Sequence, residues 1–355
     1  MVNKIISELP LLILGILIML IIVPIIRIIA LKLNIVDVPK GRKQHTKPTA
    51  LLGGISVFLG ANILFFLNPS SVDKHLTHQL FLASLMIVIL GTIDDIIDMK
   101  AIVKLIMQIL ISIYISYALG GIESIQIGSV IINFSPFWGV MFNAVWFVVL
   151  INAFNLIDGL DGLCTGSGII SIFTIMMVSC IRYDFSSLGI TMILIGVLIG
   201  FLIFNFNPAK IFLGDGGSML IGFYVSTLSV SQYKSVTFTM LLVIGLIAFL
   251  PLFDTTLAFI RRKVNGDSVF KADALHFHHR LMKKGYSAKQ AVLTIYIIMG
   301  FYALGSILIS FVPTPVKFLI FIILILFSII IIEKFYLLSG KYAYFTKFFK
   351  KLIKK

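Results

Sequence analysis

Apolar segments about as long as a bilayer is thick recur along almost the whole chain. A helix needs about 20 mostly apolar residues to cross the hydrocarbon core of a membrane. Of the 355 residues, 59% are hydrophobic and only 12% are charged, about half the charged share of a typical soluble domain. The sequence therefore predicts an all-α polytopic integral membrane protein. We expect about eleven transmembrane helices, at residues 9–31, 51–67, 79–98, 101–119, 137–154, 162–181, 187–205, 211–230, 237–260, 290–312 and 315–335.

The positive residues indicate how these helices cross the membrane. Lysine and arginine are frequent in every second connection, above all at residues 32–47 and 261–289. Because such residues favour the cytoplasmic side, we expect a plasma-membrane protein with its N-terminus outside and its C-terminus in the cytoplasm. Residues 1–340 form a single transmembrane domain, and residues 341–355 form a basic amphipathic tail on the inner surface. The net charge of +14 follows this topology, and we expect no nucleic-acid partner.

One outside connection has a pattern of its own. Residues 122–134 alternate apolar and polar side chains around Gly128 and Ser129. Such alternation around a glycine-containing turn is typical of a β-hairpin. We therefore expect a short hairpin outside the membrane.

Acidic residues stand at the ends of several apolar segments. A carboxylate at the centre of a bilayer costs about 2.5–3.5 kcal/mol, so stability does not explain them. The predicted topology brings all of these acids to the cytoplasmic face, which predicts one active site there. They are Asp94, Asp95, Asp98, Asp158, Asp161 and Asp215.

The first acidic cluster lies at residues 94–98. On a helix, Asp94 and Asp98 share a face, while Asp95 lies about 100° away. Such a cluster binds a divalent cation, or supplies a base whose proton affinity is raised by its neighbours. A solvated helix cap is the simpler alternative.

Two further motifs suit a phosphorylated nucleoside. Asp158-Gly159 and Asp161-Gly162 let the backbone turn sharply and approach a ligand, and the preceding Asn152 and Asn155 offer amide groups. In residues 214–218, glycines leave backbone N–H groups free for phosphate at the start of a helix, where Asp215 can hold Mg²⁺. A plain turn between two membrane helices is the alternative for the first motif.

Basic residues complete the set of candidates. His276, His278, His279 and Arg280 lie close together in the loop at residues 261–289. Hydrogen bonds to phosphate suit these residue types, and zinc is the alternative, although no cysteine is near and the acids favour a hard cation. Lys43 and His45 are either a nucleotide contact or ordinary positive-inside residues.

Taken in order, these motifs resemble those of the polyprenyl-phosphate N-acetylhexosamine-1-phosphate transferases over about residues 37–281. The final motif resembles the branch of that family that uses UDP-N-acetylhexosamines. The sequence departs from the branch at residues 272–274, where a proline and an arginine are common. The resemblance is carried by Asp37-x-Pro39, Arg42-Lys43-x-His45, Pro48, Gly53-Gly54, Asp94-Asp95-x-x-Asp98, Asn152-x-x-Asn155-x-x-Asp158-Gly159-x-Asp161-Gly162, Asn205, Phe212-x-Gly214-Asp215-Gly216-Gly217-Ser218 and His276-x-His278-His279-Arg280-Leu281.

The resemblance implies a reaction and a set of site residues. N-acetylhexosamine 1-phosphate, with GlcNAc 1-phosphate as the expected group, moves from a UDP-sugar to a polyprenyl phosphate such as undecaprenyl phosphate, and UMP leaves. This is the first membrane step of a cell-surface glycan pathway. Asp215 is the implied ligand of Mg²⁺, which Mn²⁺ could replace, and Asp94 and Asp95 are the implied catalytic acids. Catalytic roles are also expected for His278 and His279.

The remaining expected residues bind substrate. The resemblance places some around the uridine, and the residue types suggest contacts with phosphate or nucleotide for the others. They are Lys43, His45, Asp98, Asn152, Asn155, Asp158, Gly159, Leu160, Asp161, Asn205, Phe212, His276 and Arg280.

Two other functions would use similar residues. An intramembrane Mg²⁺-dependent prenyltransferase also has aspartate-rich helix ends, and it would release pyrophosphate. An ion-coupled transporter would use acids near the middle of the membrane. A direct transfer and a two-step route through an aspartate nucleophile both stay open, as does a homodimer.

Overall fold

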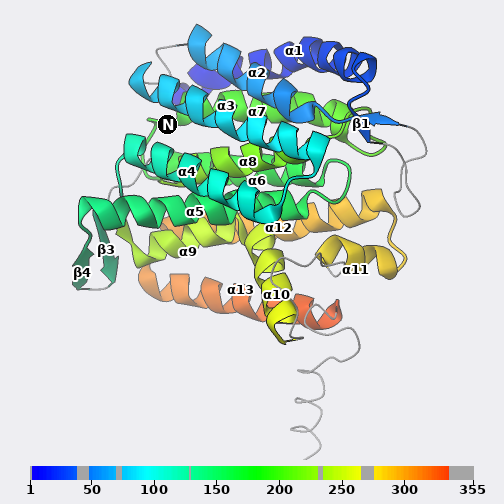
Figure 1. Ribbon diagram of the computed structural model, residues 1–355. Helices are drawn as coiled ribbons and strands as arrows, with labels where there is room; N and C mark the ends of the chain where they lie inside the picture. Colours follow the sequence, from blue (N-terminus) through cyan, green and yellow to red (C-terminus); the bar gives the residue numbers. More distant parts are fainter. Residues whose placement is uncertain are drawn as a thin grey trace, which may run out of the picture.

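The computed structural model describes residues 2–37, 48–68, 74–127, 129–230, 235–264 and 276–335, and most of them are helical. The helices stack side by side in a bundle (Figure 1). They are α1 (Val2–Lys32), α2 (Gly53–Leu67), α3 (Lys74–Ile97), α4 (Ala101–Leu119), α5 (Pro136–Ile157), α6 (Leu163–Ile181), α7 (Leu188–Asn205), α8 (Gly214–Val230), α9 (Phe238–Ile247), α10 (Phe249–Val264), α11 (Phe277–Lys283), α12 (Ala288–Phe311) and α13 (Thr314–Lys334).

Eight of the described helices are long and apolar enough to cross a membrane, namely α1, α3, α4, α5, α6, α7, α12 and α13. This confirms the prediction of a polytopic helical membrane protein. The count of eleven spans stays a prediction, because α2 has only 15 residues and α8 only 17. The predicted tail at residues 341–355 lies outside the described residues.

The predicted segment at residues 237–260 is not one helix but two. Helix α9 ends at Ile247, and α10 begins at Phe249. Pro251 explains the break, because it has no N–H to donate to the carbonyl of Ile247, four residues earlier, and its ring would clash with that carbonyl. The hydroxyl of Ser171 donates to this carbonyl instead, at 3.1 Å. Figure 1 shows that α10 then runs across the direction of the other helices.

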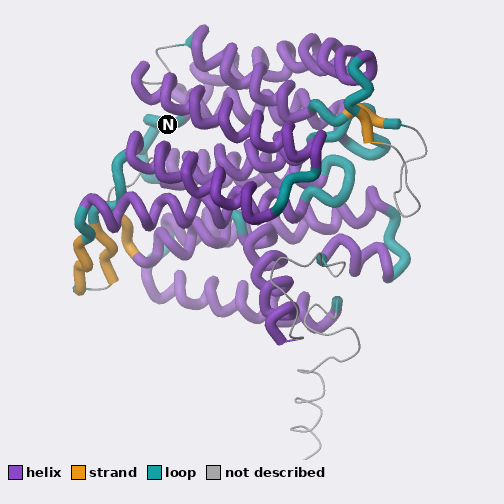
Figure 2. Tube along the Cα trace, in the orientation of Figure 1, coloured by secondary structure: helices purple, strands orange, loops and turns teal. Residues whose placement is uncertain are grey.

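Two small sheets lie at opposite ends of the bundle (Figure 2). Strands β1 (Val36–Asp37) and β2 (Thr49–Ala50) pair antiparallel at one end. At the other end, β3 (Ser124–Ile127) pairs antiparallel with β4 (Val130–Asn133), in the segment where a hairpin was expected, and parallel with β5 (Ser235–Thr237). The side of the membrane on which each sheet lies stays a prediction.

Helix α8 packs against α2, α3, α5 and α6 at the centre of the bundle. Its first turn approaches α2 and α3 without intervening side chains. A Cβ atom on Gly54 of α2 would lie 2.3 Å from the backbone nitrogen of Gly217, and one on Gly91 of α3 would lie 2.3 Å from that of Gly216. Small residues allow such close helix contacts in membranes. The glycines therefore fix where α8 begins, relative to the end of α3.

This contact gives a first prediction. Gly91→Ala should lower the free energy of unfolding by roughly 1–3 kcal/mol, as overpacking of a tight core does, because the new methyl group meets the backbone of Gly216. Gly300→Ala is the matched control, since nothing lies within 4 Å of a Cβ atom at that helical position. Thermal unfolding in detergent measures both variants. Equal unfolding temperatures for the two would contradict the proposed packing.

Candidate active site

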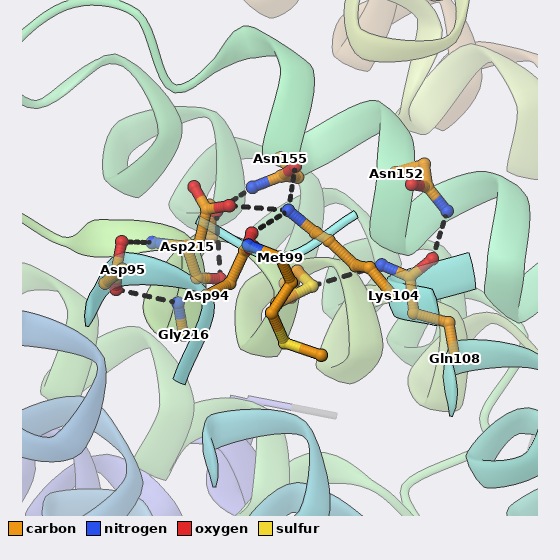
Figure 3. Close-up of polar contacts among 11 residues, drawn as sticks. Asp94, Asp95, Met99, Lys104, Gln108, Asn152, Asn155, Asp215 and Gly216 are labelled. Carbon is orange, nitrogen blue, oxygen red and sulfur yellow. Dashed lines mark hydrogen bonds and ion pairs between the residues drawn. The ribbon is translucent and has the colours of Figure 1, made fainter. Parts of the chain in front are cut away.

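Carboxylates from three parts of the chain meet around one lysine. Asp94 lies in the last turn of α3, Asp215 in the first turn of α8, and Lys104 in the first turn of α4. The ammonium nitrogen of Lys104 lies 2.6 Å from Oδ2 of Asp94 and 2.5 Å from Oδ2 of Asp215. It also donates to Oδ1 of Asn155 at 3.2 Å. Figure 3 shows Lys104 reaching between the two carboxylates. The structure thus brings together two of the three acidic motifs.

Asp95 has a different position from its neighbour Asp94. Its carboxylate accepts hydrogen bonds from the backbone N–H groups of Asp215, at 2.9 Å, and Gly216, at 3.4 Å. These groups open α8, and the first N–H groups of a helix have no partner within the helix itself. Asp95 therefore caps α8 from α3, and the positive end of the helix dipole stabilises its charge.

The two asparagines of α5 join this cluster to its neighbours. Asn155 donates to the hydroxyl of Ser218 at 3.0 Å, while its oxygen accepts from Lys104. Asn152, one turn earlier, donates to Oε1 of Gln108 at 2.7 Å. Gln108 is fully buried and lies one turn further into α4 than Lys104, so this pair lies deeper in the helix bundle than the cluster.

The loop after α5 lies beside both the cluster and the histidine motif. Burial raises the pKa of the Asp158 carboxyl well above its usual value, and the nearby carboxyls of Asp215, Asp95 and Asp161 raise it further. A Cβ atom on Gly159 would lie 2.2 Å from Nε2 of His278, so a side chain at this position would displace that ring. The loop at residues 158–162, which was expected to bind a nucleoside, is therefore in contact with the histidine motif, although more than 100 residues separate the two.

His278 is buried, and its Nε2 has no hydrogen-bond partner among the described residues. Burial lowers the pKa of this imidazole to about 3, helped by the charges of His279 and His276. His278 is therefore neutral at neutral pH in this state. The neighbouring His279 is exposed, with its ring 4.1 Å from that of His278, and Arg280 is buried.

The prediction that Asp94 and Asp98 share a helix face is wrong. Helix α3 ends at Ile97, and Asp98 has a left-handed backbone with φ of 52°. The carboxylate of Asp94 explains the turn, because it accepts a hydrogen bond from the backbone N–H of Met99 at 2.9 Å. The side chain of Asp98 is exposed, and its contact with a substrate stays a prediction.

Asp161, Asn205 and Phe212 were expected to bind substrate, and each makes hydrogen bonds that join parts of the fold. Asp161 accepts hydrogen bonds from Asn207 and from the backbone N–H of Ala209, both at 3.0 Å. The amide of Asn205 is buried and uses both ends, accepting from Thr165 at 2.8 Å and donating to the carbonyl of Ile211 at 3.0 Å.

The backbone around Phe212 joins the same loop to the start of α2. The N–H of Phe212 donates to the carbonyl of Ala50 at 2.8 Å, and its carbonyl accepts from the N–H of Gly53 at 3.1 Å. Leu160 is partly buried, and Lys43 and His45 lie outside the described residues. Substrate contacts of all these residues stay predictions.

Sequence reasoning missed Lys104, Gln108 and Asp254, the last of which contacts His276. The signal was available, because Lys104 and Gln108 lie one turn apart within a predicted membrane segment, where charged and polar side chains are costly. Asp254 likewise stands within the predicted segment at residues 237–260.

The acidic cluster supplies some, but not all, of the oxygen ligands that a hard cation such as Mg²⁺ needs. Carboxylate and amide oxygens are the ligands that Mg²⁺ prefers, and this ion often uses one or two carboxylates together with phosphate oxygens and water. Among the described residues, no three His, Cys, Asp or Glu side chains are placed to hold a metal by themselves. Asp215 would therefore supply a protein ligand, and a bound diphosphate would supply others.

Comparisons with known proteins identify the family of the chain. Residues 78–233, which include Asp94, Asp158 and Asp215, match the model of glycosyl transferase family 4. The chain is 35% identical over 345 residues to the probable undecaprenyl-phosphate N-acetylglucosaminyl 1-phosphate transferase of Bacillus subtilis (strain 168), covering 97% of this chain and 96% of that protein.

Two further bacterial proteins are also similar to the chain. The undecaprenyl-phosphate alpha-N-acetylglucosaminyl 1-phosphate transferase of Escherichia coli O157:H7 is 32% identical over 317 residues, covering 84% of this chain and 83% of that protein. The protein with the same name from Thermotoga maritima is 31% identical over 281 residues, covering 79% and 84%. The chain therefore belongs to the polyprenyl-phosphate N-acetylhexosamine-1-phosphate transferases of glycosyl transferase family 4.

Proposed function

We propose that this protein transfers GlcNAc 1-phosphate from UDP-GlcNAc to a polyprenyl phosphate such as undecaprenyl phosphate, and releases UMP. The names of its relatives support the sugar phosphate and the lipid acceptor. The observation that carries the proposal is the meeting of Asp94, Asp215 and Lys104 at one end of the bundle. Neither a prenyltransferase nor a transporter is supported by the family to which the chain belongs.

The main obstacle to this reaction is charge. A lipid phosphate must attack the phosphorus that carries the sugar, and both reactants are anions. The new bond joins an oxygen of the lipid phosphate to this phosphorus, and the bond to the bridging oxygen breaks, so that UMP leaves with the electron pair. Mg²⁺ held by Asp215 would offset the negative charge that develops on UMP.

Lys104 is placed to bind the same diphosphate. Its ammonium pairs with Asp94 and Asp215, and its side chain is only 14% exposed. In a site shielded from water, a fixed positive charge is worth far more than in solution. When a diphosphate binds, Lys104 exchanges a carboxylate for a phosphate oxygen, and Asp215 becomes free to bind the metal.

Asp94 is better placed than Asp95 to orient or deprotonate the attacking phosphate. Both oxygens of Asp95 accept hydrogen bonds from the start of α8. One oxygen of Asp94 accepts from the backbone N–H of Met99, but the other pairs with Lys104, a side chain that moves when substrate binds. Histidines 276, 278 and 279 and Arg280 add hydrogen bonds to phosphate from the side of α11.

The proposal includes the orientation of the chain in the membrane. The N-terminus lies outside the plasma membrane, and the acidic cluster faces the cytoplasm, where nucleotide sugars are found. The positive residues of alternate loops support this orientation. The short sheet of β3, β4 and β5 then faces the outside, because it lies at the end of the bundle opposite β1 and β2 (Figure 2).

The reaction is tested with purified protein in detergent. UMP should be released from UDP-GlcNAc only when undecaprenyl phosphate and Mg²⁺ are both present, and more slowly from other UDP-sugars. Asp215→Asn should lower this rate at least about 100-fold, because it removes the charge that holds the metal. Asp184→Asn, at an exposed turn after α6, should keep full activity. Full activity of Asp215→Asn would remove the metal assignment, and absence of UMP release from every UDP-sugar would reject the function.

A separate prediction concerns Lys104. Lys104→Met keeps the length and apolar stem of the side chain but removes its charge, so kcat should fall about 100- to 1,000-fold, as when a donor to a developing anion is removed. Lys100→Met removes a charge from the exposed residue before the same helix and should leave kcat unchanged. The two rates are compared by UMP release. Similar rates for both variants would mean that Lys104 does not bind the diphosphate.

The orientation is tested by labelling introduced cysteines in intact cells. Cys164 and Cys180 are buried, so the background reaction is small. A membrane-impermeant thiol reagent should label Ser129→Cys, beside β4, in intact cells, and should label Lys100→Cys only after the membrane is opened. The reverse pattern would show that the protein has the opposite orientation.

A further inference from the structure

The helix that carries the histidine motif is anchored by a residue that the reaction proposed above does not use. Asp254, on α10, is only 3% exposed. Its Oδ2 lies 2.9 Å from Nδ1 of His276, and its Oδ1 accepts a hydrogen bond from the backbone N–H of Phe277 at 3.0 Å. One carboxylate thus fixes both the ring of His276 and the first residue of α11.

Helix α11 needs such an anchor. It has only seven residues, and a helix this short is not stable by itself in water. Its N-cap residue, His276, makes no side-chain capping bond. Asp254 supplies the missing acceptor from another helix, and the ring of Phe277 packs edge-on against that of Phe335 with centroids 5.0 Å apart.

The contact also requires a proton on Nδ1 of His276, because an aspartate carboxylate only accepts hydrogen bonds. The ring can then donate to an anionic ligand from Nε2 when that nitrogen carries a proton as well. Outer partners of this kind set the tautomer and orientation of functional histidines. The ring of His276 is parallel to that of His278, with centroids 6.0 Å apart, and Nε2 of His278 lies against Gly159. By orienting His276, Asp254 therefore also affects how the neighbouring His278 packs against the loop after α5.

We propose that Asp254 is a positioning residue, which orients His276 and the start of α11 so that an Nε2–H group of the doubly protonated ring donates to an oxygen of the sugar-nucleotide diphosphate. This inference rests on the proposed function. It explains why a buried carboxylate is present on α10, since an unpaired buried charge is costly and this one is paired with His276 and with a backbone N–H group.

The test is a double-mutant cycle on UMP release with Asp254→Asn and His276→Ala. Asparagine keeps the size of the side chain and an oxygen for the N–H of Phe277, but not the carboxylate beside His276. Asp254→Asn should lower kcat about 10- to 100-fold, with an unfolding temperature close to that of the parent. When His276 is already alanine, Asp254→Asn should cause no further loss, because its effect acts through that ring.

Several outcomes would overturn the inference. Full activity of Asp254→Asn would do so, as would a loss in the double variant equal to the product of the two single losses, which indicates a general structural role. If Asp254→Asn does not fold, Asp254→Glu, which keeps the charge with a different reach, takes its place in the cycle. Asp184→Asn is the matched control. A parent protein that releases no UMP contradicts the proposed function itself, whereas an active parent with an unaffected Asp254→Asn contradicts only the role of Asp254.

Discussion

The contact between the first turn of α8 and the ends of α2 and α3 determines where the active site forms. Glycines at 54, 91, 216 and 217 let these backbones approach without side chains between them. Because α8 begins at Gly214, this contact brings Asp215 beside Asp94 and gives Asp95 the helix N-terminus to cap. The carboxylates meet because backbones pack closely, and the cost of gathering like charges is met by that packing and by Lys104.

The cluster has more negative than positive charge, and this excess is consistent with binding a divalent cation. Among the described residues, the carboxylates of Asp94 and Asp215 share the ammonium group of Lys104, and the carboxylate of Asp95 lies beside them at the start of α8. A divalent cation would restore the balance and bring the phosphates of a substrate with it. The same arrangement explains why two anions can react here, because a lysine, a metal and the residues of α11 offset their repulsion from different sides.

The sequence alone predicted the helical membrane fold and a site where the acidic motifs meet, because long apolar segments and misplaced charges are local signals. It did not predict contacts that depend on the packing of distant segments. Lys104 was missed because its spacing along the chain does not show that its ammonium lies between carboxylates of two other helices. Asp98 was placed on a helix that ends one residue earlier. Asp161 and Asn205 hold a loop together within the fold, which no spacing along the chain reveals. Pro251 was a local signal for the break between α9 and α10 that length alone obscured.

The central claim is that Asp215 and Lys104 exchange partners when substrate binds. The most direct measurement is a structure of the protein with UDP-GlcNAc and Mn²⁺, with the metal located by its anomalous scattering. The account predicts a metal peak bonded to Asp215 and to the diphosphate, with the ammonium of Lys104 moved from Asp215 to a phosphate oxygen. A metal bound away from Asp215, or a Lys104 that still bridges Asp94 and Asp215 beside a bound diphosphate, would contradict it.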